Sequence, residues 1–221
     1  MAKRTAKKEQ TSADHIISAY QDYVLNHGRR PATVYKFCKE IGITESAFYK
    51  VAGSFQALEG IIWSKAMSLT LDKVSSDRQF AEFNSREKIL AVYFTLLEHL
   101  RENRSFLLET AGLKGKPEIT PGCMKEFRRL FEEFVAGVLS EGKVSGELAS
   151  RPYLEKRYPQ LFWLHLNLLL RFWADDDSAD FERTDAFVEK SVNLAFDLVG
   201  KGALDSALDL AKFLYQGKFR S

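Results

Sequence analysis

The chain has 221 residues, 45% of them hydrophobic and 28% charged, which is ordinary for a globular protein and argues against disorder beyond its ends. Its longest apolar stretch, residues 161–173, is interrupted by polar residues and is shorter than the ~18 residues that suggest a membrane span. Cys38 and Cys123 form no regular disulfide framework, and no apolar run follows the basic N-terminus as in a secretory signal. We therefore expect a cytoplasmic protein without a membrane span.

The net charge of +2 is unevenly distributed along the chain. Residues 1–54 hold nine Lys and Arg against five Asp and Glu, a net charge of +4, so the remainder sums to −2. A basic segment on a slightly acidic body is typical of a protein that meets a polyanion at one end. A solvated charged segment is the alternative.

Apolar residues recur at helical spacing in the N-terminal part of the chain. We expect a first helix over residues 12–26, with the cap at Thr11 or Ser12 and His27-Gly28 at its end. Pro31 and Thr33 open a short second helix that extends to about residue 40, and a third spans about residues 45–50 with Thr44 as its cap. Gly42 lies between the two short helices and gives the chain the freedom that a tight turn needs.

The rest of the chain is also predicted to be helical. Ser54 caps a long fourth helix, and Asn84-Ser85-Arg86-Glu87 resembles a capping box. Further helices are expected over residues 121–139, 159–174, 183–199 and 203–215, with a loop at 142–151. No stretch alternates apolar and polar residues long enough for a convincing strand, so the predicted fold is all-α.

The helices at 159–174 and 183–199 carry more apolar surface than one buried side requires. The second of them has two apolar stripes, one with Val188 and Val192 and the other with Phe187, Leu194 and Leu198. One stripe can face the core of the domain and the other a partner. We therefore predict a homodimer built mainly from these two helices.

Two short helices joined by a glycine-containing turn, after a longer first helix, are the parts of a helix-turn-helix. The residues at this place resemble the pattern of the TetR family of bacterial transcription regulators over roughly residues 12–60. The matching positions are Ala19, Gly28, Thr33, Phe37, Cys38, Gly42, Ile43, Thr44, Phe48, Tyr49 and Leu58.

This resemblance implies a three-helix DNA-binding domain at residues 1–54 and a larger helical ligand-binding and dimerisation domain at 55–221. It also implies that the small core of the DNA-binding domain is formed by Phe37, Cys38, Ile41, Ile43 and Phe48, so that Cys38 is a buried hydrophobic residue. The residues expected to contact double-stranded operator DNA are Lys3, Arg4, Val34, Tyr35, Thr44, Glu45, Ser46, Ala47, Tyr49 and Lys50. For Tyr49 and Lys50 the structural alternatives are packing and solvation.

The chain departs from the family pattern at three positions. Ala52 stands where the family usually has Phe, and Phe55 stands where it has a phosphate-binding Lys, which predicts a weaker salt-sensitive component of DNA affinity. Glu45 adds a negative charge at the groove. It could accept a hydrogen bond from the amino group of cytosine, or it could equally indicate that DNA binding has decayed. Basic residues near the N-terminus could compensate as a flexible arm.

No pattern typical of an enzyme is present. The four histidines are scattered, without the spacing of metal ligands, a phosphate-binding loop or a nucleophile motif, so no catalytic residue, metal or cofactor is predicted. A small hydrophobic ligand is expected in an apolar cavity of the C-terminal domain, and tight packing of the same residues is the alternative. The polar contacts assigned to this cavity are His99, His165, Asn167 and Arg171.

A shorter resemblance concerns residues 173–187, which look like the corresponding region of lipid-binding proteins of ubiquinone biosynthesis that share a TetR-like fold. The sequence thus favours a homodimeric TetR-like regulator, most simply a repressor released from DNA by a hydrophobic ligand. A TetR-fold lipid-binding protein with vestigial DNA binding is the alternative.

Overall fold

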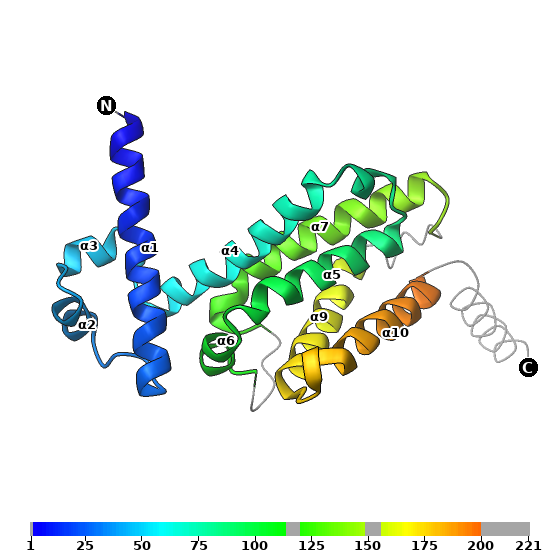
Figure 1. The fold of residues 1–221 in the computed structure, drawn as a ribbon. Helices are drawn as coiled ribbons and strands as arrows, with labels where there is room; N and C mark the ends of the chain where they lie inside the picture. Colours follow the sequence, from blue (N-terminus) through cyan, green and yellow to red (C-terminus); the bar gives the residue numbers. More distant parts are fainter. Residues whose placement is uncertain (1, 114–119, 149–155, 200–221) are drawn as a thin grey trace, which may run out of the picture. The chain divides into compact units, whose positions relative to one another are not determined.

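The computed structural model describes residues 2–113, 120–148 and 156–199, and every regular element in this part of the chain is a helix (Figure 1). The all-α prediction is thereby confirmed. The chain forms two compact units, one from residues 1–69 and 98–130, the other from residues 70–97 and the chain from 131 onward. The boundary expected after residue 54 stays a prediction.

The helix-turn-helix elements lie where the sequence indicates them. Helix α2 (Val34–Glu40) is capped by Thr33, whose hydroxyl oxygen accepts from the Lys36 N–H at 3.1 Å. Helix α3 (Glu45–Tyr49) follows after the Gly42 turn, and α4 (Phe55–Ser76) begins with Ser54 accepting from the Ala57 N–H at 3.1 Å. These caps satisfy backbone donors that a helix start leaves unpaired.

Helix α1 (Ala2–His27) begins ten residues before the predicted start at Ser12. The prediction was wrong because it looked for a cap, whereas residues 2–10 consist largely of Ala, Lys, Arg, Gln and Glu, which favour helix without one. The expected flexible N-terminal arm is therefore part of α1.

The remaining elements follow α4 from residue 78 onward. Helix α5 begins with the predicted capping box: the Asn84 N–H donates to Glu87 at 2.8 Å and the Glu87 N–H donates to Asn84 at 3.0 Å. Helix α6 was not predicted, and the expected helix at 203–215 lies outside the described residues. The elements are η1 (Arg78–Glu82), α5 (Ser85–Arg101), α6 (Arg104–Thr110), η2 (Gly122–Met124), α7 (Lys125–Val144), α9 (Tyr158–Asp175), η3 (Ala179–Phe181) and α10 (Glu182–Val199).

The loop predicted to start at Gly142 starts later, because α7 continues to Val144. Gly142 does not break the helix; it is buried, and a β-carbon there would lie 2.2 Å from the Ser85 hydroxyl oxygen. The missing side chain thus allows the start of α5 to lie against α7. Gly146, with φ +81°, follows the end of the helix.

Each unit has its own apolar core. In the first, Trp63 of α4 packs edge-on against Phe127 of α7, with ring centroids 5.4 Å apart. In the second, Phe131 of α7 lies between Tyr93 of α5 and Trp163 of α9, at 6.0 and 6.3 Å. Among the described helices, none is both long and apolar enough to cross a membrane.

Candidate functional site

The turn between α2 and α3 fixes the two short helices against each other. Gly42 adopts φ +74°, a left-handed conformation that favours glycine, and the following Ile43 N–H donates to the Cys38 carbonyl at 2.9 Å. Thr44 then starts α3, its hydroxyl oxygen accepting from the Ala47 N–H at 3.2 Å. Thr44, a predicted DNA contact, is therefore also the cap of α3.

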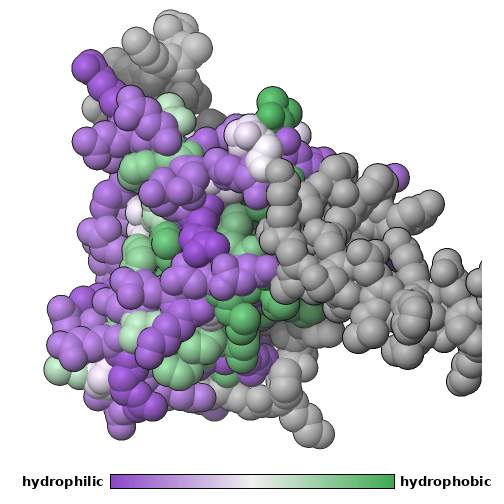
Figure 2. Space-filling view, turned by 90° about the vertical axis from the view of Figure 1, so that its right-hand side faces the viewer, coloured by the Kyte–Doolittle hydropathy of each residue, from purple (hydrophilic) through white to green (hydrophobic). Residues whose placement is uncertain are grey.

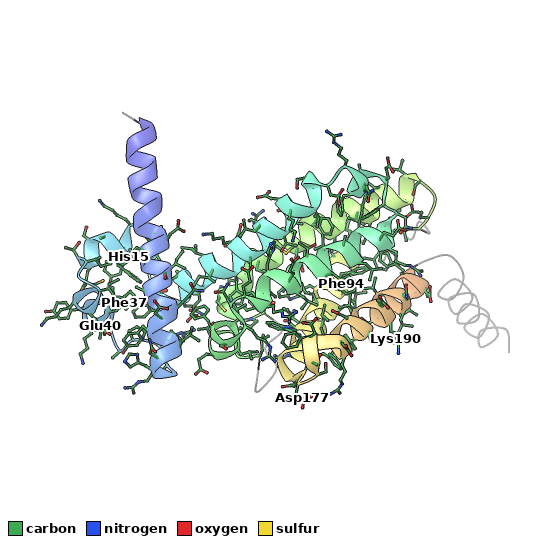
Figure 3. The ribbon with its side chains drawn as sticks, viewed as in Figure 1. His15, Phe37, Glu40, Phe94, Asp177 and Lys190 are labelled. Atoms are coloured by element: carbon green, nitrogen blue, oxygen red, sulfur yellow. The ribbon has the colours of Figure 1, made fainter. Side chains whose placement is uncertain are left out.

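The inner side of this motif is an aromatic core. Phe37 and Phe48 are completely buried and 6.2 Å apart, and Cys38 is buried beside them, as the sequence predicts. Phe37 lies toward α1 (Figure 3), where Tyr20 packs edge-on against it at 6.0 Å. Burial raises the pKa of the Cys38 thiol, and the nearby Glu45 adds to this effect. This thiol is therefore a core residue without the features of a nucleophile.

The outer side of α3 carries the predicted base contacts. Ser46, Tyr49 and Lys50 are exposed, and their spacing of three and four residues places them on one face of the helix. Tyr35 of α2 is 60% exposed and Tyr49 is 52% exposed, far more than expected for rings that pack in a core. Thr44 is exposed as well, whereas Val34, Glu45 and Ala47 are half-buried.

Lys3 and Arg4 fall within α1, and their side chains lie outside the described part of the structure. The charge on α2 and α3 themselves is small. They carry three exposed lysines, Lys36, Lys39 and Lys50, and two acidic residues, Glu40 and Glu45. A surface with this balance gives DNA a modest electrostatic attraction.

Phe55, at the position of the family's phosphate-binding lysine, turns into the aromatic core. Its ring stacks on Tyr20 at 5.2 Å with an angle of 7°, and lies 5.6 Å from Phe37 and 5.4 Å from Phe48. Ala52 is buried and small. The aromatic ring missing at position 52 is thus replaced by the ring of Phe55. Phe55 carries no positive charge and is packed in the core, so it cannot bind a phosphate.

A buried ionic network that the sequence did not reveal joins α1, the following loop and α4. Glu59 is fully buried; it accepts from the Tyr20 hydroxyl at 2.7 Å and from the Arg30 guanidinium at 2.7 and 2.5 Å. Burial raises the pKa of Tyr20, and the hydrogen bond to Glu59 raises it further. The available signal was an acidic residue on the apolar side of the fourth helix, between Leu58 and Ile62.

The four polar residues predicted to contact a ligand fall into two groups. His99 belongs to the first unit, whereas His165, Asn167 and Arg171 belong to the second. Asn167 is buried and donates to the Trp163 carbonyl of its own helix at 2.9 Å. Arg171 is half-buried. His99 lines a cavity of the first unit.

His165 is a notable member of the second group. Its Nδ1 lies 3.1 Å from the hydroxyl of the fully buried Tyr93, and its ring is tilted against the Tyr93 ring at 5.5 Å. Burial lowers the pKa of His165 to about 4, so the ring is neutral at pH 7. Its Nε2 is buried without a hydrogen-bond partner within the described residues. A buried polar atom of this kind is costly unless a water or ligand pairs with it.

Comparison with known proteins gives one family and a set of similar folds. The family model described as "Tetracyclin repressor-like, C-terminal domain" matches residues 88–214, more than half of the chain. No curated protein matches.

Several solved structures resemble this one over most of their length. A putative TetR family transcription regulator from Shewanella sp. PV-4 has a TM-score of 0.59 at 13% identity and covers 86% of this chain and 99% of its own. The fatty acid degradation regulator FadR from Bacillus halodurans has 0.56 at 21%, over 83% and 97%. FadR from Bacillus subtilis, solved with stearoyl-CoA, has 0.55 at 15%, over 86% and 98%. At these identities the likeness concerns the fold.

Proposed function

Because this chain belongs to the TetR family of transcription regulators, we propose that it binds double-stranded operator DNA as a homodimer and leaves it when a small hydrophobic ligand binds. The observation that carries the proposal is the exposed face of α3 with Ser46, Tyr49 and Lys50, held by the buried core of Phe37 and Phe48. A rigid short helix with exposed polar side chains is what major-groove reading requires.

The residues of this surface have separate roles in the proposal. Ser46 and Lys50 contact base edges in the major groove. Tyr49 and Tyr35 contact the DNA backbone, and Thr44 caps the start of α3. Lys3 and Arg4 on α1 contact phosphates. Val34, Glu45 and Ala47 complete the contact surface. Since Phe55 is committed to the core, phosphate contacts must come from other basic residues.

The homodimer is supported by leucines that the second unit leaves exposed. Leu161, Leu164 and Leu168 are 45–56% exposed and share one face of α9, and Leu194 and Leu198 of α10 are 60% and 47% exposed. Figure 2 shows hydrophobic side chains at the surface between hydrophilic ones. Two copies that bury these leucines place two readers on one DNA, which a palindromic operator requires.

Ligand release in this proposal is a population shift between forms of the dimer that differ in the distance between their two DNA-binding domains. A ligand that binds better to the form whose spacing does not fit the operator lowers the affinity for operator DNA. We assign a ligand contact to His165, because its Nε2 has no partner among the described residues while its Nδ1 lies 3.1 Å from the Tyr93 hydroxyl. Asn167 and Arg171 lie on the same helix. The stearoyl-CoA complex belongs to a structural neighbour and supports an apolar ligand in this fold. The family match does not favour the lipid-binding alternative, and the family that it names consists of transcription regulators.

Selection of bound DNA from a random pool tests the proposal directly. The intact protein should enrich a palindrome whose half-site centres lie about one helical turn apart. Lys50→Glu should weaken binding to it and change the preferred bases, since a good base contact discriminates by ~1–3 kcal/mol. Lys125→Glu, which alters an exposed lysine of α7, is the matched control and should leave the preference unchanged. Enrichment of no sequence at low salt would refute the proposal.

A further inference from the structure

The first unit contains a cavity of about 170 Å³ that belongs neither to the DNA-reading surface nor to the surroundings of His165. It lies among α1, α4, the end of α5 and α6. Its apolar wall comes from all four helices, with Ile17 of α1, Ile62 of α4, Leu100 of α5 and Leu107 of α6. Ala66 of α4 also faces it and leaves room that a larger residue would fill.

The rim of the cavity is polar. Gln21 of α1 donates to Asn103 at 3.1 Å, and Lys65 of α4 pairs with Asp14 of α1 at 3.0 Å. Glu102, another lining residue, adds a second carboxylate, so these three charged groups sum to −1. The rim therefore offers hydrogen-bond donors and acceptors, and its carboxylates disfavour an anion.

We propose that this cavity binds one small neutral amphiphile, an apolar ring or short chain with a single hydrogen-bonding group, and that its occupancy changes operator affinity. The pocket opens to solvent at its polar rim, where Lys65, Glu102 and Asn103 are exposed. Its volume suits about one ring with a small substituent directed toward that rim. The effect on operator affinity rests on the proposed DNA-binding function, whereas the binding of the ligand in the cavity does not.

Packed aromatic rings connect the cavity to the helix-turn-helix formed by α2 and α3. Leu107 of its wall directly follows Phe106 on α6, and the buried Phe106 ring lies edge-on to Tyr20 at 5.9 Å. Tyr20 in turn packs on Phe37 of α2 and stacks on Phe55. A molecule bound between α1 and α6 changes the position or the mobility of the Tyr20 side chain. This in turn changes how α2 and α3 pack against α1. Couplings of this kind change affinity at least fivefold.

The binding test uses benzyl alcohol as the probe and the full-length protein with labelled methyl groups. The probe should shift the signals of Ile17 and Ile62 in a saturable manner and give nuclear Overhauser contacts to Leu107 in the wild-type protein. Ala66→Leu should abolish both, whereas Ala136→Leu, the same change at an exposed helical position, should preserve them. Benzoate of equal size should bind at least tenfold more weakly because it carries a charge.

Three results would overturn the binding site: no saturable shift, contacts to methyl groups elsewhere only, or equal binding by Ala66→Leu. Benzoate binding as tightly as benzyl alcohol would overturn the neutral ligand class. Operator affinity is then measured with and without saturating probe, and a change below fivefold would overturn the coupling while leaving DNA binding intact. Failure of the protein to select any DNA would instead refute the proposed function, and the methyl shifts would still decide the cavity.

Discussion

Glu59 is the residue on which the attachment of α1 and its following loop to α4 depends. It is fully buried, whereas its partner Arg30 is half-exposed. Arg30→Met should therefore reduce the free energy of unfolding by about 3–5 kcal/mol, because it leaves a buried carboxylate without its counter-charge. Adding Glu59→Gln should restore part of the loss, since the amide carries no charge and still accepts from Tyr20. Urea unfolding checks both.

The control for the Glu59 prediction is an exposed ion pair of the same unit. Lys65 and Asp14 are each more than half exposed, so Lys65→Met should cost less than about 1 kcal/mol. A double variant less stable than Arg30→Met alone would contradict the interpretation of Glu59 as a buried charge that needs Arg30.

His165 makes stability depend on pH in a defined window. Its pKa of about 4 in the folded protein lies below the ordinary 6.5, so the unfolded chain binds the proton more readily between these values. Stability is therefore full above pH 6.5 and falls as the pH drops toward 4, by about 3 kcal/mol at pH 4. The difference in unfolding free energy between wild type and His165→Gln, measured from pH 7 to 4, should follow this curve. A difference independent of pH would show that His165 is not buried as a neutral ring.

Helix α10 begins on a carboxylate supplied by the end of α9. The buried Asp176 accepts from the Thr184 N–H at 2.9 Å and hydroxyl at 2.6 Å, and from the Ser178 N–H at 2.9 Å and hydroxyl at 2.7 Å. Burial acts to raise the pKa of Asp176, but these hydrogen bonds outweigh it and hold the pKa well below its usual value of 3.8. The start of α10 is thus built on an ionised side chain.

Asp176→Ala should lower the free energy of unfolding by about 2–3 kcal/mol at pH 7, since charge-assisted bonds at a helix start are lost. The wild-type advantage should persist above pH 4 and shrink as the pH falls below it, because a depressed carboxylate pKa stabilises only the ionised form. The neighbouring Asp177 is 91% exposed and pairs with Arg183 at 3.4 Å, so Asp177→Ala should change stability by under about 1 kcal/mol. Equal losses in the two alanine variants, measured by thermal unfolding, would contradict the capping role.

At the scale of the whole molecule, the exposed leucines of α9 and α10 determine the proposed assembly. Charges at Leu168 and Leu194 should prevent association, because each places a carboxylate in an interface that must be dry. Light scattering should report two chains for the wild-type protein and one for the Leu168→Glu/Leu194→Glu variant, which should also lose tight operator binding. Val144→Glu changes a 90% exposed residue of α7 and should remain dimeric. A dimeric double variant would place the interface elsewhere.

The sequence by itself determined most of the helix boundaries and the family of this protein. Caps and breaks act over a few residues, so Thr33, Thr44, Ser54 and the pair Asn84 and Glu87 could be read from the chain, and the periodic apolar residues gave α9 and α10 to within a residue or two. Of the second stripe predicted on α10, Leu194 and Leu198 are exposed, whereas Phe187 is half-buried and stacks on Phe172 at 4.6 Å.

Only the tertiary structure decided what depends on contacts between distant residues. Gly142 looks like a helix breaker until Ser85 is found against it. The sequence shows Phe55 only as the loss of a phosphate contact, and its role in the aromatic core appears when its ring is found on Tyr20. Glu59 and Arg30 are 29 residues apart, and no local pattern pairs them. Helical spacing gives the side of a helix on which a residue lies, but a partner, a cavity or an unpaired atom arises only when that side meets another.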